Sequence, residues 1–106
     1  MRYNTQVVLA YFKQERLPYC VPEFTFCEGR KFRWDFAFPD FRLAIEVQGG
    51  LFSGGRHVRG AALLQEQEKR NIGAELGWRI LYVTPQELCM MDTVNMVKKC
   101  VAFRLS

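Results

Sequence analysis

Residues 33–48, which read RWDFAFPDFRLAIEVQ, decide the fold. Apolar side chains alternate with less apolar ones over residues 32–38 and again over 43–47, which is the two-residue period of β-strands. Pro39 and Asp40 lie between the two runs and favour a turn. We therefore expect two neighbouring strands that form an antiparallel hairpin.

The remaining elements follow from helical or strand periodicity and from the positions of Gly and Pro. The expected order is α-β-β-β-α-β-α. The second helix then crosses over between the third and fourth strands, which makes those two strands parallel. The predicted segments are a helix at 5–16 with Asn4 or Thr5 as N-cap, a strand at Phe24 and Phe26 after Pro22, a helix at 59–76, a strand at 78–83 and a helix at 86–103.

The whole chain has 106 residues and 49% hydrophobic content, which suits one compact domain over residues 1–106. A net charge of +4 favours polyanionic partners such as nucleic acid, although charge alone is a weak signal. No apolar run approaches the roughly 18 residues that would span a bilayer, so we expect an intracellular protein with no membrane partner. Reduced, mostly buried thiols are expected at Cys20, Cys27, Cys89 and Cys100.

Asp35 interrupts an aromatic strand, where its carboxylate is disfavoured by both strand propensity and desolvation. Strict alternation places Asp35 on one face with Arg33 and Ala37. The opposite face should carry three aromatic side chains, Trp34, Phe36 and Phe38. A half-exposed strand in which Asp35 pairs with Arg33 or another cation is the alternative.

Glu46 and Gln48 share one face of the next strand with Ala44. The hairpin brings Glu46 close to Asp35, and two close carboxylates repel unless one is protonated or a cation lies between them. Hard oxygen ligands of this kind suit Mg²⁺ or Mn²⁺. The alternative is a solvated face of an antiparallel sheet.

The second predicted helix carries polar residues on the stripe that faces the sheet. At 100° per residue this stripe comprises Ala61, Gln65, Lys69, Ile72 and Leu76. We expect Gln65 and Lys69 to point inward, where the lysine ammonium could offset negative charge on a phosphate or an attacking hydroxide. Both long side chains could instead extend outward to solvent.

Basic residues gather before this helix, and one further carboxylate lies near the first strand. Arg56, His57 and Arg59 follow Gly54-Gly55, so backbone donors and cations could meet a phosphate there. His57 as a catalytic base is a less favoured reading than contact with substrate or exposure in a loop. Glu23 is either a third site carboxylate or a solvated strand start.

Together these residues resemble the PD-(D/E)XK nuclease superfamily, in which Asp is followed after about ten residues by Glu-x-Lys. The pattern stands here as Asp35 and then Glu46-Val47-Gln48. The longer strings RKFRWDFAFP (30–39), LAIEVQGG (43–50), GGRH (54–57), EKRN (68–71) and GW (77–78) are similar to small phage and bacterial proteins related to very-short-patch repair endonucleases.

The resemblance implies a restriction-endonuclease-like αβββαβ core with a mixed central sheet flanked by helices. It also implies an Mg²⁺- or Mn²⁺-dependent deoxyribonuclease in the cytoplasm of a bacterial host, with a phage gene as one origin. DNA would be the substrate, and a homodimer or protein partner would supply specificity. The expected DNA contacts are Arg33, Arg56, His57 and Arg59.

By the same resemblance, Asp35 and Glu46 would be metal ligands, joined by the backbone carbonyl of Val47. Gln48 stands where the family has its motif lysine, and it cannot carry a positive charge. Lys69 on the following helix matches members in which that lysine has moved. The departure leaves open a catalytically inactive nucleic-acid-binding module, and a protein-interaction domain is a third alternative.

Overall fold

The computed structural model describes residues 3–48 and 60–103. The elements are α1 (Thr5–Gln14), β1 (Val21–Thr25), β2 (Arg33–Phe38), the 3-10 turn η1 (Pro39–Phe41), β3 (Leu43–Val47), α3 (Gly60–Glu75), β4 (Arg79–Val83), the 3-10 turn η3 (Pro85–Glu87) and α4 (Met91–Ala102). They form a mixed four-stranded sheet ordered β1-β2-β3-β4. β1, β2 and β3 pair antiparallel in turn, whereas β3 and β4 are parallel. The predicted β2–β3 hairpin and the predicted parallel pairing of β3 with β4 are confirmed.

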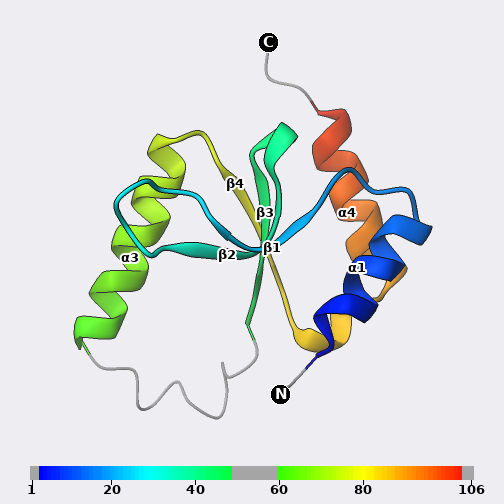
Figure 1. Cartoon of the computed structure of the whole chain (residues 1–106), viewed down its shortest axis with the longest axis horizontal. Coiled ribbons are helices and arrows are strands. Elements are labelled where there is room, and N and C mark those ends of the chain that lie inside the picture. The colour runs from blue at the N-terminus through cyan, green and yellow to red at the C-terminus, as the bar shows by residue number, and fades with distance from the viewer. Residues whose placement is uncertain (1–2, 49–59, 104–106) are drawn as a thin grey trace.

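Helices cover both faces of this sheet, with α3 on one side and α1 and α4 on the other (Figure 1). The larger core cluster lies beneath α1 and α4, and the smaller, aromatic cluster lies beneath α3. The larger comprises Val8, Phe12, Phe36, Phe38, Leu43, Ile45, Val83, Leu88 and Val97. The smaller comprises Trp34, Ala37, Ala44 and Trp78. None of the described helices is long and apolar enough to cross a membrane.

Trp34 contradicts the predicted face of β2. It packs in the cluster beneath α3, whereas Phe36 and Phe38 pack beneath α1 and α4. Strict alternation would place all three together, so the prediction is wrong at Trp34. The cause is an irregularity at Asp35, where pairing with β3 ends and one pair with β1 is missing.

Two helix boundaries also differ from the predicted ones. The Asn4 side chain caps α1 by accepting from the Val7 N–H at 3.0 Å, as expected, but the helix ends at Gln14 because Arg16 turns left-handed with φ 63°. The last helix begins at Met91 rather than at residue 86.

Local hydrogen bonds explain the late start of α4. The Glu87 carboxylate accepts from the Thr84 N–H at 2.7 Å, and the Glu87 carbonyl accepts from the Thr93 hydroxyl at 2.7 Å. These bonds stabilise a separate 3-10 turn before the chain enters α4. All four cysteines are free thiols, as predicted, but Cys89 is exposed and the other three are half-buried.

Candidate functional site

The candidate site lies where β2 and β3 stop pairing. The last paired residues at this end are Phe36 and Ile45. Beyond them, the Asp35 N–H donates to Glu46 Oε2 at 2.9 Å, and the Val47 N–H donates to Asp35 Oδ2 at 2.7 Å. Each carboxylate therefore accepts from a backbone amide of the other strand, in place of the sheet's own hydrogen bonds.

The opposite side of β2 is also irregular at this point. The β1–β2 register passes from Pro22↔Phe36 to Phe24↔Trp34 and leaves out the facing pair Glu23 and Asp35. Glu23 has φ 47°, a left-handed conformation that is strained for a residue with a side chain. The strained residue and the missing pair together free the Asp35 backbone to turn its N–H toward β3.

Lys69 reaches this strand break from α3. Its Nζ lies 2.5 Å from Glu46 Oε1, and the side chains of Lys69 and Glu46 are only 13% and 7% exposed. The same ammonium lies over the Trp34 ring, 5.1 Å from its centroid, at a distance where cation–π attraction adds to the ion pair. The structure thus brings Asp35, Glu46 and Lys69 together.

The predicted inward stripe on α3 is wrong for three of its five residues. Gln65, Ala61 and Leu76 are exposed, so only Lys69 and Ile72 from that stripe are partly buried. The buried residue of α3 is Gly73, which lies so close to Trp34 that an added Cβ would be 2.7 Å from the ring. Close approach of α3 to this large ring sets which residues face the sheet.

Burial and the ion pair with Lys69 act in opposite directions on the pKa of Glu46. Desolvation raises the pKa of Glu46 above its ordinary value of 4.5, while the hydrogen bonds from Lys69 and from the Asp35 backbone limit the rise. The nearby Asp35 charge raises the pKa further. The same acids act on Tyr3. The pKa of its phenol is raised first by burial and then by the charges of Asp35, Glu23 and Glu46.

A surface hollow of about 300 Å³ opens onto these groups and is lined by Glu23, Lys31, Phe32, Arg33, Trp34, Asp35 and Lys69. Within it, Glu23 and Arg33 form an exposed ion pair at 2.9 Å. The sequence pattern assigned none of Tyr3, Lys31 and Phe32 to the site. Their only advance signal was nearness in sequence to the first helix or to Asp35, which does not separate them from ordinary surface residues.

Other predicted site residues are placed less fully. Gln48 is half-buried at the end of β3, and its backbone N–H donates to the Val83 carbonyl at 2.7 Å. Arg56, His57 and Arg59 lie outside the described residues. Gln48 therefore lies directly after β3, two residues beyond Glu46. The predicted basic loop stays a prediction.

The acid pair fits a hard divalent cation in its donor chemistry. Among the described residues, no group of three or more His, Cys, Asp or Glu side chains gathers to hold a metal ion. Asp35 Oδ1 receives no hydrogen bond within that part of the chain, and Asp35 lines the open hollow. Mg²⁺ commonly uses one or two carboxylates and completes its shell with water and phosphate oxygens, so two carboxylates suffice.

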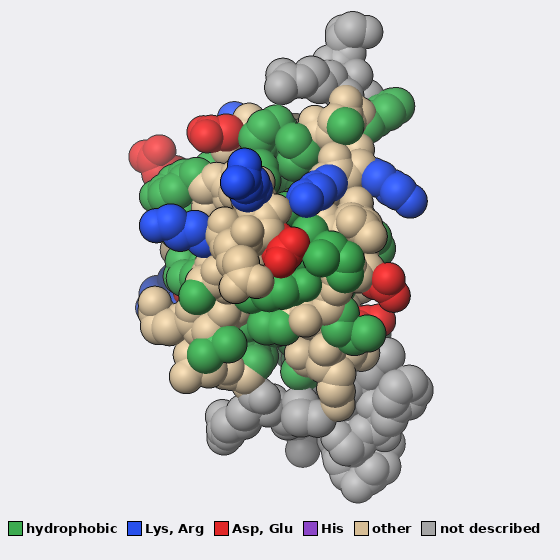
Figure 2. Space-filling view, turned by 90° about the vertical axis from the view of Figure 1, so that its right-hand side faces the viewer, with side chains coloured by type: hydrophobic (Ala, Val, Ile, Leu, Met, Phe, Trp, Pro, Cys, Tyr) green, Lys and Arg blue, Asp and Glu red, His purple; other side chains and the backbone are tan. Residues whose placement is uncertain are grey.

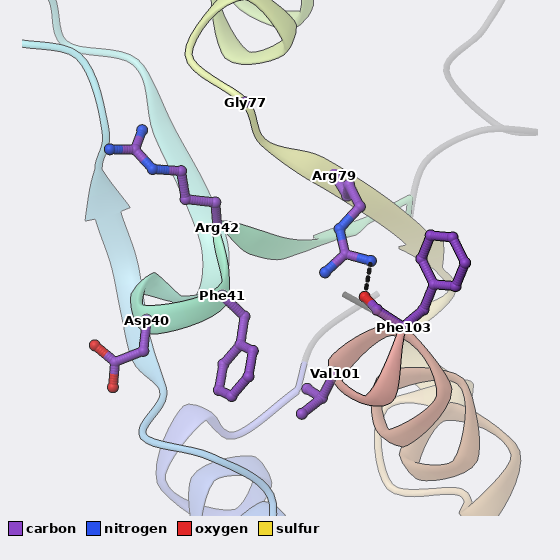
Figure 3. A pocket seen from close by; sticks show the side chains of 7 residues that line it. All are labelled: Asp40, Phe41, Arg42, Gly77, Arg79, Val101 and Phe103. Atoms are coloured by element: carbon purple, nitrogen blue, oxygen red, sulfur yellow. Dashed lines mark hydrogen bonds between the residues drawn. The ribbon is translucent and has the colours of Figure 1, made fainter. Parts of the chain in front are cut away.

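A second hollow, of about 350 Å³, lies at the opposite end of β3 and contains two arginines (Figure 3). Arg42 donates to the Leu76 carbonyl at 2.6 Å, and Arg79 donates weakly to the Phe103 carbonyl at 3.5 Å. Those carbonyls lie at the C-terminal ends of α3 and α4, where positive charge offsets the helix dipole. These arginines are accounted for by helix capping.

Comparison with known protein families, curated proteins and solved structures finds no match for this chain. The described residues define a mixed α/β domain with a four-stranded sheet and three helices. Its distinguishing feature is a carboxylate pair and a buried lysine at the break between β2 and β3.

Proposed function

We propose that this domain is a metal-dependent endonuclease that hydrolyses phosphodiester bonds in DNA, on a restriction-endonuclease-like αβββαβ core. The observation that carries the proposal is the meeting of Asp35, Glu46 and Lys69 at the strand break beside an open hollow. Phosphoryl transfer requires positive charge near the reacting phosphate, and this arrangement offers both a cation site and an ammonium group.

Asp35 and Glu46, with the backbone carbonyl of Val47, are the groups proposed to hold Mg²⁺ or Mn²⁺. The ion would supply charge neutralisation at the phosphate and a more acidic water as nucleophile. Gln48 would orient that water through its amide. Lys69 neutralises Glu46, and its ammonium lines the hollow, so it could contact a phosphate oxygen once the carboxylate has another partner.

The first test is cleavage of linear and branched DNA by the purified protein in Mg²⁺ and in Mn²⁺. Asp35→Asn and Glu46→Gln are the informative variants, because each retains an oxygen that can accept the backbone N–H bonds of the site. We expect both to lower the cleavage rate by about 100-fold or more, as when an electrostatic catalytic group is removed, with DNA affinity retained. Full activity of either variant would refute the assignment.

Lys69→Met separates the role of the lysine from that of the acid pair. If the ammonium stabilises the transition state, the rate constant should fall by about 100-fold while DNA affinity changes little. Arg70→Met is the matched control, since Arg70 is an exposed neighbour that pairs with Glu66 on the same helix. An unchanged rate in Lys69→Met would exclude Lys69 as the substitute for the motif lysine.

The alternative function is a catalytically inactive nucleic-acid-binding module of the same fold. The Lys69–Glu46 ion pair favours it, because it neutralises the buried carboxylate with no metal ion. Salt-dependent DNA binding without cleavage of any substrate in either metal would support this alternative. Absence of salt-dependent binding would instead point to a protein-interaction domain.

A further inference from the structure

A third hollow adjoins the candidate site at the start of β2. It measures about 440 Å³, and we call it the approach hollow, lined by Thr25, Arg30, Lys31 and Arg33. Lys31 and Arg33 also line the hollow that contains Asp35 and Lys69. The two hollows therefore share a wall, and a ligand that lies across the site continues over these two cationic side chains.

The lining of the approach hollow contains three cationic side chains and no carboxylate. Arg30 donates to both oxygens of Glu68, at 2.9 and 2.8 Å, and Arg33 pairs with Glu23 at 2.9 Å. Lys31 has no acidic partner among the described residues. Exposed ion pairs of this type are weak, so a polyanion can take the place of Glu23 on Arg33 at little cost.

One further group suits a nucleic-acid strand. Phe32 lines the hollow that contains Asp35 and Lys69, and the Arg30 guanidinium lies over its ring at 4.4 Å. Cations interleaved with aromatic rings are typical of surfaces that track a nucleic-acid backbone.

We propose that Lys31 and Arg33 bind the sugar–phosphate backbone of a nucleic-acid strand next to the phosphate that a metal ion on Asp35 and Glu46 would hold. The inference rests on the proposed function for the position of the reacting phosphate, and it adds the direction of the strand, along the β1–β2 connection. A phosphodiester chain fits because it offers closely spaced anions, which attract the unpaired Lys31 and can displace the exposed Glu23 from Arg33.

The test is the affinity for a labelled DNA duplex and a labelled single strand, measured by fluorescence anisotropy in EDTA over a range of salt concentrations. Lys31→Ala should weaken binding by about two- to fivefold, as expected for one exposed charge contact. It should also reduce the slope of log affinity against log salt by about 1. Lys13→Ala is the matched control, since Lys13 is exposed on α1, on the other side of the sheet, and should alter neither quantity.

The outcomes separate this inference from the proposed function. An unchanged affinity and slope in Lys31→Ala overturns the inference, while loss of cleavage in Asp35→Asn would still support the nuclease. A Lys31-dependent affinity without any cleavage supports the inference and refutes the nuclease. If polyglutamate displaces DNA and binds with the same dependence on Lys31, the approach hollow recognises acidic protein and the inference is wrong.

Discussion

Glu46 combines three interactions that do not favour the same protonation state. Burial favours its neutral form and raises its pKa above 4.5, whereas Lys69 and the Asp35 N–H favour the carboxylate. Because the net shift is upward, the folded protein holds this proton more tightly than the unfolded chain does. The contribution of Glu46 to the free energy of unfolding is therefore fully present below pH 4.5 and is lost as the pH rises through the raised pKa.

Replacing Lys69 by Met should raise the pKa of Glu46 further, because the thioether side chain keeps the apolar contact with Trp34 but removes the stabilising charge. The stability loss should then occur at a higher pH. NMR titration of labelled glutamate carboxyl groups measures the pKa, and urea unfolding across the same pH range measures the stability. Arg70→Met should leave both unchanged, and an unaltered Glu46 pKa in Lys69→Met would contradict the ion pair.

At the residue scale, the sequence identified the members of the site that break an apolar pattern. Asp35 and Glu46 stand out because strands with buried faces rarely carry carboxylates, and Lys69 stands out with Gln65 on a stripe whose other members are apolar. Tyr3 and Lys31 break no pattern. Their positions depend on how the chain ends and hairpins fold back, which periodicity does not encode.

At the scale of elements, the contact between α3 and β2 depends on the absence of a side chain. Gly73 lies against Trp34, where a Cβ would be 2.7 Å from one ring carbon and 2.8 Å from another. Trp34 in turn supports the Lys69 ammonium. The position of Lys69 at the acid pair is therefore linked to Gly73 on its own helix.

Gly73→Ala should destabilise the protein by about 1–3 kcal/mol, the usual cost of overpacking a tight contact. Gly60→Ala is the matched control on α3, since nothing lies within 4 Å of the Cβ it would add, and it should be neutral or slightly stabilising. Urea unfolding of both variants gives the comparison. Equal stabilisation of the two would show that α3 does not pack against Trp34 in solution.

The β2–β3 hairpin and the parallel pairing of β3 with β4 were predictable, because a short turn joins the first two and a helix crosses over between the second two. The errors arose where side chains replace backbone pairing. Asp35 breaks the alternation that would have placed Trp34 correctly, and Glu87 organises the turn before α4. Such bonds override propensity at single positions, so the periodicity cannot reveal them.

For the whole molecule, the face of the sheet covered by α1 and α4 lies apart from the candidate site. Figure 2 shows the face covered by α1 and α4, where hydrophobic side chains spread through the middle and Lys and Arg lie mainly in the upper half. Exposed apolar side chains of these helices include Val7 and Met96. Lys69 comes from α3 on the other side of the sheet, so a partner on the α1–α4 face would leave the candidate site open. The homodimer itself stays a prediction.

Metal binding should stabilise the whole domain, because both proposed ligands also join β2 to β3. At 100 times the dissociation constant, Mg²⁺ or Mn²⁺ should add about 2.7 kcal/mol to the free energy of unfolding. Thermal unfolding with and without the metal chloride, at matched ionic strength, measures this effect. Glu46→Gln should abolish it, and an equal shift in that variant would place the metal elsewhere.

The exchange of backbone bonds between Asp35 and Glu46 has an evolutionary consequence. Each carboxylate satisfies an amide that the parted strands would otherwise leave without an acceptor. Selection for folding alone would therefore preserve both acids in a descendant that had lost all catalysis. In relatives of this domain, conservation of the acid pair would therefore reflect the needs of folding. Loss of the lysine that faces it would be the earlier sign that catalysis has been lost.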